Sequence, residues 1–215
     1  MYKKPVVCIC LSIIAFLGIS LQAQSTEELQ EQIEVLNNQI STLEHTFDVL
    51  SKKIDDVLWK QKLEDVAWVD KVYIYGPPHW QADNPAFTGD RNPVKFWTYT
   101  IIPKNVDPAL KYPLIVLPHG GVHSDFSTYY THIVRELIAQ GYIIVAAEYR
   151  GSTGYGKSHY EKIDYGGLEV EDVKASRDYM IETYDIVDSK RVGIIGWSHG
   201  GLITLMNIFD HPKDY

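Results

Sequence analysis

Residues 192–201 read VGIIGWSHGG, a short apolar run followed at once by a glycine-rich turn with a serine at its centre. The run Val192 to Ile195 predicts a buried strand, and the apolar stretch Leu202 to Phe209 predicts a helix directly after the turn. The turn matches G-x-S-x-G, which holds a serine at the sharp bend between a strand and a helix. We expect Gly196 and Gly200 to be glycines because side chains there would collide with neighbouring backbone.

The serine of this turn is the candidate nucleophile. Such a bend holds Ser198 at the carboxyl edge of a sheet, where its hydroxyl can attack an acyl carbonyl. The developing oxyanion needs amide donors, and His199 supplies one directly after the serine. The loop His119-Gly120-Gly121 follows another apolar run and is expected to supply the second. The alternatives are a serine that only caps a helix, and a metal pair of His119 with His123.

Further apolar runs place this turn in an α/β fold. Runs without alternation suit strands that are buried on both faces, and helical stretches separate them, so a doubly wound, mostly parallel sheet is expected. The expected strands are Val72–Tyr75, Lys95–Ile102, Leu114–Leu117, Tyr142–Ala147 and Val192–Ile195, and the expected helices are Ser127–Gln140 and Leu168–Tyr184.

A second glycine-rich segment competes for the chemistry. Residues 151–158 read GSTGYGKS and satisfy the phosphate-loop pattern G-x-x-x-x-G-K-[ST]. A phosphate loop must open a substantial helix, yet only His159 to Asp164 precede the next break at Tyr165-Gly166-Gly167. We therefore expect a turn that lines the cleft beside Ser198, and no nucleotide partner.

The segment 25–65 has a periodicity of its own. From Leu29 to Val57, apolar residues alternate at spacings of four and three, which is a heptad repeat. With Leu29 at position d, most a positions are Ile and most d positions are Leu, a division that favours a parallel two-stranded coil. Phe47 at an a position fits a dimer poorly. The pattern predicts a homodimer through residues 29–57, or else an amphipathic helix that lies on its own domain.

The first residues resemble an export signal. Lys3 and Lys4 precede an apolar run from Val6 to Leu21, and a small-residue cleavage site ends at Ala23. Residues 1–23 are therefore expected to be a signal peptide of an exported protein, periplasmic or secreted. An uncleaved, membrane-anchoring signal is the alternative.

Composition narrows the range of partners. The 215 residues include 20 Lys and Arg against 28 Asp and Glu, a net charge of −8, which argues against a nucleic-acid partner. Both cysteines, Cys8 and Cys10, lie inside the expected signal. A thiol nucleophile and a thiolate metal site are therefore not expected in the exported part.

Four motifs in order resemble a known family. They are Pro118-His119-Gly120-Gly121, the stretch Glu148 to Gly156, the run Leu168 to Val173, and Gly196 to Gly201. Together they resemble the catalytic domain of the prolyl oligopeptidase family of serine peptidases, which has the α/β-hydrolase fold. The resemblance covers residues 93–215 and explains the apparent phosphate loop as a turn of the family.

The resemblance implies roles for individual residues. Ser198 would be the nucleophile, the amide of His199 an oxyanion donor, and His119 the occupant of the position that gives the second donor. Gly120, Gly121, Tyr155 and Trp197 would contact substrate. The implied reaction is hydrolysis of peptide or related acyl bonds without metal or organic cofactor.

The order of the catalytic triad in this fold limits what the chain is expected to do. The acid and the histidine follow the serine in chain order, which places them beyond Tyr215. We therefore expect an incomplete α/β-hydrolase over residues 72–215 that is inactive and poorly soluble by itself. The predicted function is a serine peptidase. A carboxylesterase of the same fold and a non-catalytic coiled-coil interaction protein are the alternatives.

Overall fold

The structure is a computed structural model that describes residues 26–78 and 93–215. The expected signal peptide, with Cys8 and Cys10, lies outside these residues, and so do the export and anchoring predictions that rest on it. Within the described ranges, every helix is too short or too polar to span a bilayer. The chain forms two compact units, residues 1–41 and 42–215, and the boundary falls inside the first described helix.

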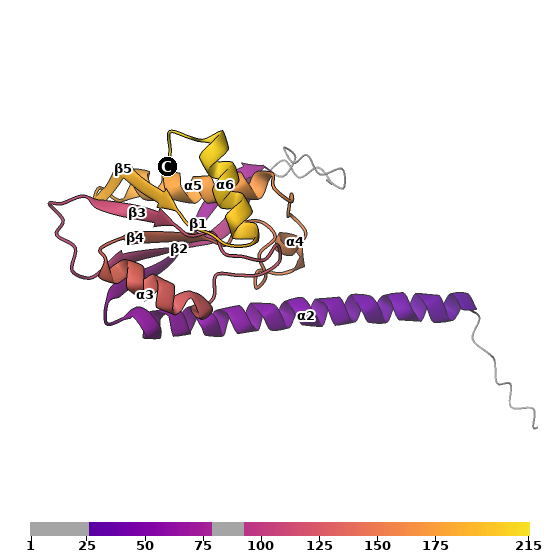
Figure 1. The fold of residues 1–215 in the computed structure, drawn as a ribbon. Helices are drawn as coiled ribbons and strands as arrows, with labels where there is room; N and C mark the ends of the chain where they lie inside the picture. The colour runs from indigo at the N-terminus through magenta and orange to yellow at the C-terminus, as the bar shows by residue number, and fades with distance from the viewer. Residues whose placement is uncertain (1–25, 79–92) are drawn as a thin grey trace, which may run out of the picture. The chain divides into compact units, whose positions relative to one another are not determined.

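A single five-stranded sheet forms the centre of the second unit (Figure 1). Its strand order is β1-β2-β4-β3-β5. β2 runs antiparallel to β1 and to β4, whereas β3 runs parallel to β4 and to β5, so all strands except β2 point the same way. The mostly parallel sheet is therefore confirmed. The strands are β1 (Ala67–Pro78), β2 (Pro93–Pro103), β3 (Tyr112–Val116), β4 (Ile143–Ala147) and β5 (Val187–Ile194).

Helices cover both faces of the sheet. α3 (Thr131–Ala139) packs on one face, together with the last turns of α2 (Thr26–Leu63), while α5 (Leu168–Thr183) and α6 (His199–Asp210) pack on the other (Figure 1). The central strand β4 sends its side chains alternately into the two cores and is buried throughout. A strand covered on both faces needs apolar residues at every position, which explains its unbroken run IIVAA.

Two strands are longer than their apolar runs. β5 begins at Val187, whereas the sequence predicted a start at Val192. The prediction missed the first half of the strand because that half is polar and partly exposed, as in a loop. β1 extends well beyond the predicted Val72–Tyr75, because it pairs with β2 from Ala67↔Pro103 onward. Backbone pairing, which apolar patterning does not report, defines both starts.

Helix α2 occupies nearly all of the predicted segment 25–65. Trp59 and Leu63, close to its end, are fully buried against the sheet core. Lys52, two helical turns before Trp59, is buried too. The heptad positions from Leu29 to Val57 behave differently, since all of them are exposed. The part of α2 that packs on the sheet therefore uses a face other than the heptad stripe.

Candidate active site

The serine turn joins β5 to α6 and holds a strained residue. Ser198 adopts φ 54° and ψ −126°, a conformation that is costly for a residue with a side chain. Its side chain is exposed to solvent, and it stands as the residue that precedes the first turn of a twelve-residue helix. The predicted nucleophile is thus accessible at the carboxyl edge of the sheet.

Close backbone approach explains the two glycines that flank the serine. A side-chain carbon at Gly196 would lie 2.2 Å from the carbonyl oxygen of Gly200, and one at Gly200 would lie 2.4 Å from the carbonyl oxygen of Pro118. Carbon and oxygen atoms that are not bonded do not approach this closely. The sharp bend therefore requires glycine at both positions, as the sequence predicted.

The loop after β3 lies against this bend. The carbonyl of His119 also presses on Gly200, at 2.6 Å from a hypothetical side-chain carbon there. Gly120 faces the residue before the serine, because a side chain on Gly120 would meet the carbonyl oxygen of Trp197 at 2.9 Å. The amide of Gly120 donates to the hydroxyl of Tyr130 at 3.3 Å. The structure thus brings the predicted oxyanion loop next to Ser198.

His199 has two separate roles in the bend. As the first residue of α6, it has an amide without an intrahelical acceptor, at the positive end of the helix dipole. Its imidazole is turned inward, where Nε2 lies 3.1 Å from a carboxylate oxygen of the buried Glu169. Burial alone would raise the pKa of Glu169, but the hydrogen bond with His199 and those from the backbone amides of Gly166 and Glu169 together lower it.

The side chain of His119 is not available to a substrate. It is fully buried, stacks on Tyr149 at 4.2 Å and contacts the hydroxyl of Ser152 through Nε2 at 2.9 Å. Burial lowers the pKa of His119 to about 4, so the ring is neutral at pH 7. His119 does lie in the loop beside the serine, as predicted, but only its backbone can serve there.

The remaining predicted contact residues divide into two places. Trp197 packs on Tyr130 at 4.5 Å beside the oxyanion loop, and the carbonyl of Gly121 accepts a hydrogen bond from the hydroxyl of Tyr149 at 3.1 Å. Tyr155 instead lines a separate cavity of about 440 Å³ with Lys71 and Trp97, and Ser198 is not among the lining residues. Tyr155 and the serine bend are therefore not brought together in this structure.

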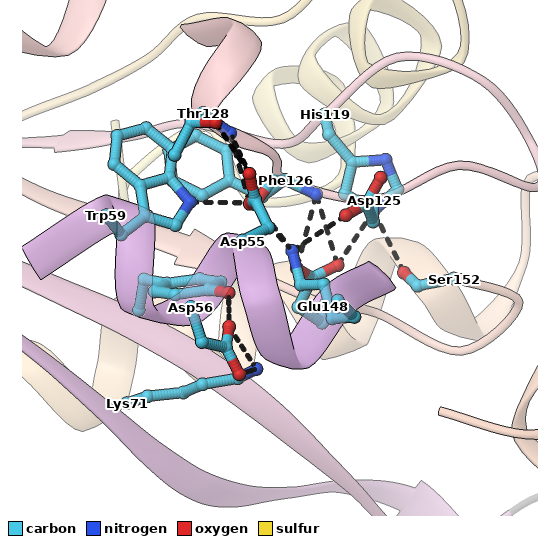
Figure 2. Close-up of polar contacts among 12 residues, drawn as sticks. Asp55, Asp56, Trp59, Lys71, His119, Asp125, Phe126, Thr128, Glu148 and Ser152 are labelled. Atoms are coloured by element: carbon cyan, nitrogen blue, oxygen red, sulfur yellow. Dashed lines mark hydrogen bonds and ion pairs between the residues drawn. The ribbon is translucent and has the colours of Figure 1, made fainter. Parts of the chain in front are cut away.

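A buried ion cluster lies behind the oxyanion loop (Figure 2). The ammonium of Lys52 contacts a carboxylate oxygen of Glu148 at 2.6 Å, a carboxylate oxygen of Asp125 at 2.8 Å and the carbonyl oxygen of Phe126 at 2.7 Å. An ammonium has three N–H groups, so these three acceptors satisfy it completely. Glu148 has no exposed surface, and Lys52 has almost none.

The charges in this cluster stabilise one another. Burial opposes charge on both groups, but their mutual attraction, together with that of Asp125 on Lys52 and of His119 and Lys71 on Glu148, outweighs it, so the pKa of Lys52 is raised and the pKa of Glu148 is lowered. Glu148 also accepts from the amide of Phe126 at 3.2 Å and lies 3.6 Å from Nε2 of His119. The cluster therefore joins α2, the end of β4 and the segment between the oxyanion loop and α3.

Other residues of α2 hold the same segment (Figure 2). Asp55 accepts hydrogen bonds from the amide and the hydroxyl of Thr128, at 3.1 and 2.6 Å. The indole of Trp59 donates to the carbonyl of Phe126 at 3.2 Å and stacks on its ring at 4.8 Å. The sequence analysis missed these roles, although Glu148 belongs to a motif that it singled out. The sequence signal on α2 was Trp59, a large aromatic residue at heptad position f, where the other residues are polar.

The rival glycine-rich segment is a structural turn. It is followed by α4 (Lys157–Tyr160), which has only four residues and is too short to hold a phosphate at its amino terminus. Just before it, Arg150 forms a fully buried ion pair with Asp172 at 2.7 Å. The hydroxyl of Ser152 donates to the carbonyl of Tyr149 at 2.7 Å. This segment is thus bound into the protein core, as a turn rather than a phosphate loop.

The described histidines are engaged elsewhere. Those whose ring nitrogens form contacts reach groups other than the serine, and in residues 26–78 and 93–215 no side chain is hydrogen-bonded to the Ser198 hydroxyl. His119 and His123 bind different partners. No group of three or more potential metal-ligating side chains occurs in the same part of the chain. The described residues therefore contain the predicted nucleophile and the predicted oxyanion loop but no base positioned on the serine.

The sheet order and the sharp turn between β5 and α6 are those of an incomplete α/β-hydrolase fold, with the predicted nucleophile Ser198 in that turn. Residues 127–215 match the model of the prolyl oligopeptidase family.

Curated relatives agree with this assignment. The acylamino-acid-releasing enzyme of Homo sapiens is 28% identical over 181 residues, which cover 81% of this chain and 24% of the enzyme. The uncharacterized peptidase YuxL of Bacillus subtilis is 38% identical over 104 residues, which cover 47% of this chain and 16% of the relative. The chain therefore spans less than a quarter of the length of these relatives.

Solved structures share the fold. An acylaminoacyl peptidase in complex with Z-Gly-Gly-Phe-chloromethyl ketone superposes with a TM-score of 0.57 at 21% identity, over 69% of this chain and 22% of that one. A puromycin-hydrolyzing peptidase of Mycobacterium tuberculosis gives a TM-score of 0.54 at 24% identity, over 66% of this chain and 20% of that one. The predicted fold class is thereby confirmed.

Proposed function

We propose that this chain carries the nucleophile and oxyanion part of a serine peptidase that cleaves amide bonds through an acyl-enzyme. One observation carries the proposal: Ser198 is exposed at a strained bend, and the loop 118–121 packs directly on the glycines and tryptophan of that bend. A serine that only caps a helix would not need this strain or this neighbouring loop.

The reaction follows from these positions. The Ser198 oxygen attacks the carbonyl carbon, and its proton passes through a base to the leaving amine as the carbon–nitrogen bond breaks. The negative oxygen of the intermediate is stabilised by the amide of His199 at the amino terminus of α6 and by amides of the loop 118–121. Water then hydrolyses the ester between Ser198 and the acyl group, which regenerates the hydroxyl.

We infer that the base comes from residues outside those the structure describes. His119, the histidine in the oxyanion loop, is buried against Ser152 and Glu148, and His199 is held by Glu169. Without a base on the serine, attack is slower by about 10⁴-fold, although the oxyanion donors retain part of the rate enhancement.

The names of the relatives indicate the substrate class. They include several acylamino-acid-releasing enzymes, whose name describes release of an acylated amino acid. We therefore propose short peptides, with a blocked or free amino end, as substrates. An ester with the same acyl group would react at the same serine, because the acyl-enzyme step is common to both.

A fluorophosphonate probe tests the proposal directly. We expect slow covalent labelling of the chain that disappears completely in Ser198→Ala, because among the residues the structure describes only this serine is exposed next to the predicted oxyanion loop. Ser158→Ala is the matched control, since Ser158 is also exposed but lies in the other glycine-rich turn. Mass spectrometry of the labelled peptide identifies the site. Labelling that persists undiminished in Ser198→Ala, or its absence even from a chain extended to supply the base, would refute the proposal.

A further inference from the structure

Helix α2 carries an apolar stripe that nothing covers in the described residues. Nine consecutive heptad positions are between 44% and 69% exposed. Contiguous apolar surface of this extent on a soluble protein marks an interaction site. The stripe consists of Leu29, Ile33, Leu36, Ile40, Leu43, Phe47, Leu50, Ile54 and Val57.

The opposite face of the same helix is already occupied. Lys52 and Trp59 are buried in the second unit, and both occupy heptad position f when Leu29 is at d. Neighbouring stripe residues such as Leu50 and Val57 precede them by two positions, which is about 200° around the helix. The stripe therefore points away from the surface that α2 uses to hold the sheet unit.

We propose that the stripe pairs with the same stripe of a second copy of this chain, in a parallel two-stranded coiled coil. Spacings of four and three along the stripe are those of a seam between two supercoiled helices. Ile dominates the a positions and Leu the d positions, the arrangement that favours two parallel strands. The proposal is independent of the peptidase function.

The flanks of the stripe suit a second identical chain. Positions e and g are mostly uncharged, as at Gln30, Gln32, Asn37 and Gln39, and the seam from Leu29 to Val57 has one acidic residue, Glu44, at these positions, so two copies of this acidic protein repel each other little along it. Acidic residues of the same helix, such as Glu31 and Glu34, occupy the outward positions f and b. An f position also points outward in a coiled coil, so each copy can keep its Lys52 contacts while its stripe forms the seam.

A pair of adjacent substitutions tests the seam. Leu36 at position d is 55% exposed and Val35 at position c is 49% exposed. The two residues are thus about equally exposed, but only Leu36 lies in the proposed seam. In sedimentation equilibrium of the whole chain, we expect twice the chain mass for the unsubstituted protein and for Val35→Glu. Leu36→Glu should weaken association by roughly 100-fold or more, because each dimer would bury two carboxylates at the seam.

Three outcomes would overturn the proposal. They are a monomeric unsubstituted chain, an Leu36→Glu chain that dimerises as tightly as the unsubstituted chain, and a Val35→Glu chain that dissociates as readily as Leu36→Glu. Thermal unfolding of each variant shows that the second unit remains folded. Both positions lie in residues 1–41, outside the second unit.

Disulfide trapping tests the parallel direction. In a chain with Cys8→Ser and Cys10→Ser, Ile33→Cys places one cysteine at an a position near the start of the stripe. In a parallel dimer the two copies of position 33 face each other and should form an intermolecular disulfide under mild oxidation. A dimer that fails to cross-link through this cysteine would rule out the parallel arrangement.

Discussion

Two glycine-rich turns each follow a parallel strand, and different helices follow them. The turn 196–201 exposes Ser198 and leads into the twelve-residue helix α6, whereas the turn 151–158 buries Ser152 and leads into the four-residue helix α4. Both match a known functional pattern in sequence. The comparison teaches that the meaning of such a pattern depends on the helix that follows it.

The largest expected effect concerns the turn that presents the serine. Gly196→Ala should reduce the free energy of unfolding by more than about 4 kcal/mol, because the added carbon overlaps backbone of Gly200 that cannot move aside. A side-chain carbon at Gly156, in the other turn, would meet no atom within 4 Å. Gly156→Ala should therefore lower the free energy of unfolding by only about 1 kcal/mol, the strain of an alanine at φ 86°. Urea denaturation measures both, and similar losses would contradict the distinction between the turns.

The second effect concerns the buried ion pair of Lys52 and Glu148. Lys52→Met should cost about 3 to 4 kcal/mol, because it leaves the carboxylate of Glu148 buried without its cation. Adding Glu148→Gln removes that charge and should restore much of the loss. A double-mutant cycle from chemical denaturation gives the coupling energy. If Glu148→Gln made the Lys52→Met chain less stable still, the unpaired carboxylate would not be the cause of the loss in stability.

A third test uses pH. His119 has a folded pKa of about 4 against an ordinary 6.5, so between these values the unfolded chain binds a proton that the folded chain does not. Stability should therefore fall as pH drops from 6.5 to 4, by roughly 3 kcal/mol. The lowered pKa of Glu148 acts in the same direction, since its contribution is lost as pH falls through that folded value.

His119→Gln separates the histidine from the other groups. A glutamine does not titrate, so the slope of stability against pH between 6.5 and 4 should flatten in this variant. Thermal unfolding at several pH values measures the slope for both chains. An unchanged slope would show that His119 is not the group that makes stability depend on pH in this range.

The smallest effect is expected at the lysine of the phosphate-loop pattern. Lys157 is about half exposed, and its ion pair with Glu161 is 3.7 Å long and lies one helical turn away on the surface. Lys157→Ala should change stability by less than about 0.5 kcal/mol. Calorimetry with ATP and magnesium should show no heat that depends on Lys157. Binding that Lys157→Ala abolishes would show that the second turn holds phosphate after all.

Local patterns predicted the serine site well. Gly196, Ser198 and Gly200 lie within five residues, and the backbone bend that requires them is set by the adjoining strand and helix. The central strands were predictable for the same reason, since burial on both faces leaves an unbroken apolar run such as Ile143–Ala147.

Long-range pairings were not predictable from the sequence. Lys52 and Glu148 are far apart in the chain, and nothing in either segment specifies the partner, because packing of α2 on the sheet creates the contact. The start of β5 was missed because Asp188 to Arg191 are polar, although they continue the strand. Tyr155 was expected beside Ser198 because its glycine-rich turn resembles one of the family, but in this structure it lines another cavity.

The position of Lys52 determines where the sheet unit can be cut. An expression boundary at residue 72, where the sequence pattern turns from helical to stranded, would remove the cation of Glu148 together with the indole of Trp59. A shortened protein should therefore start before Thr42, so that it keeps the turns of α2 that carry Lys52 and Trp59.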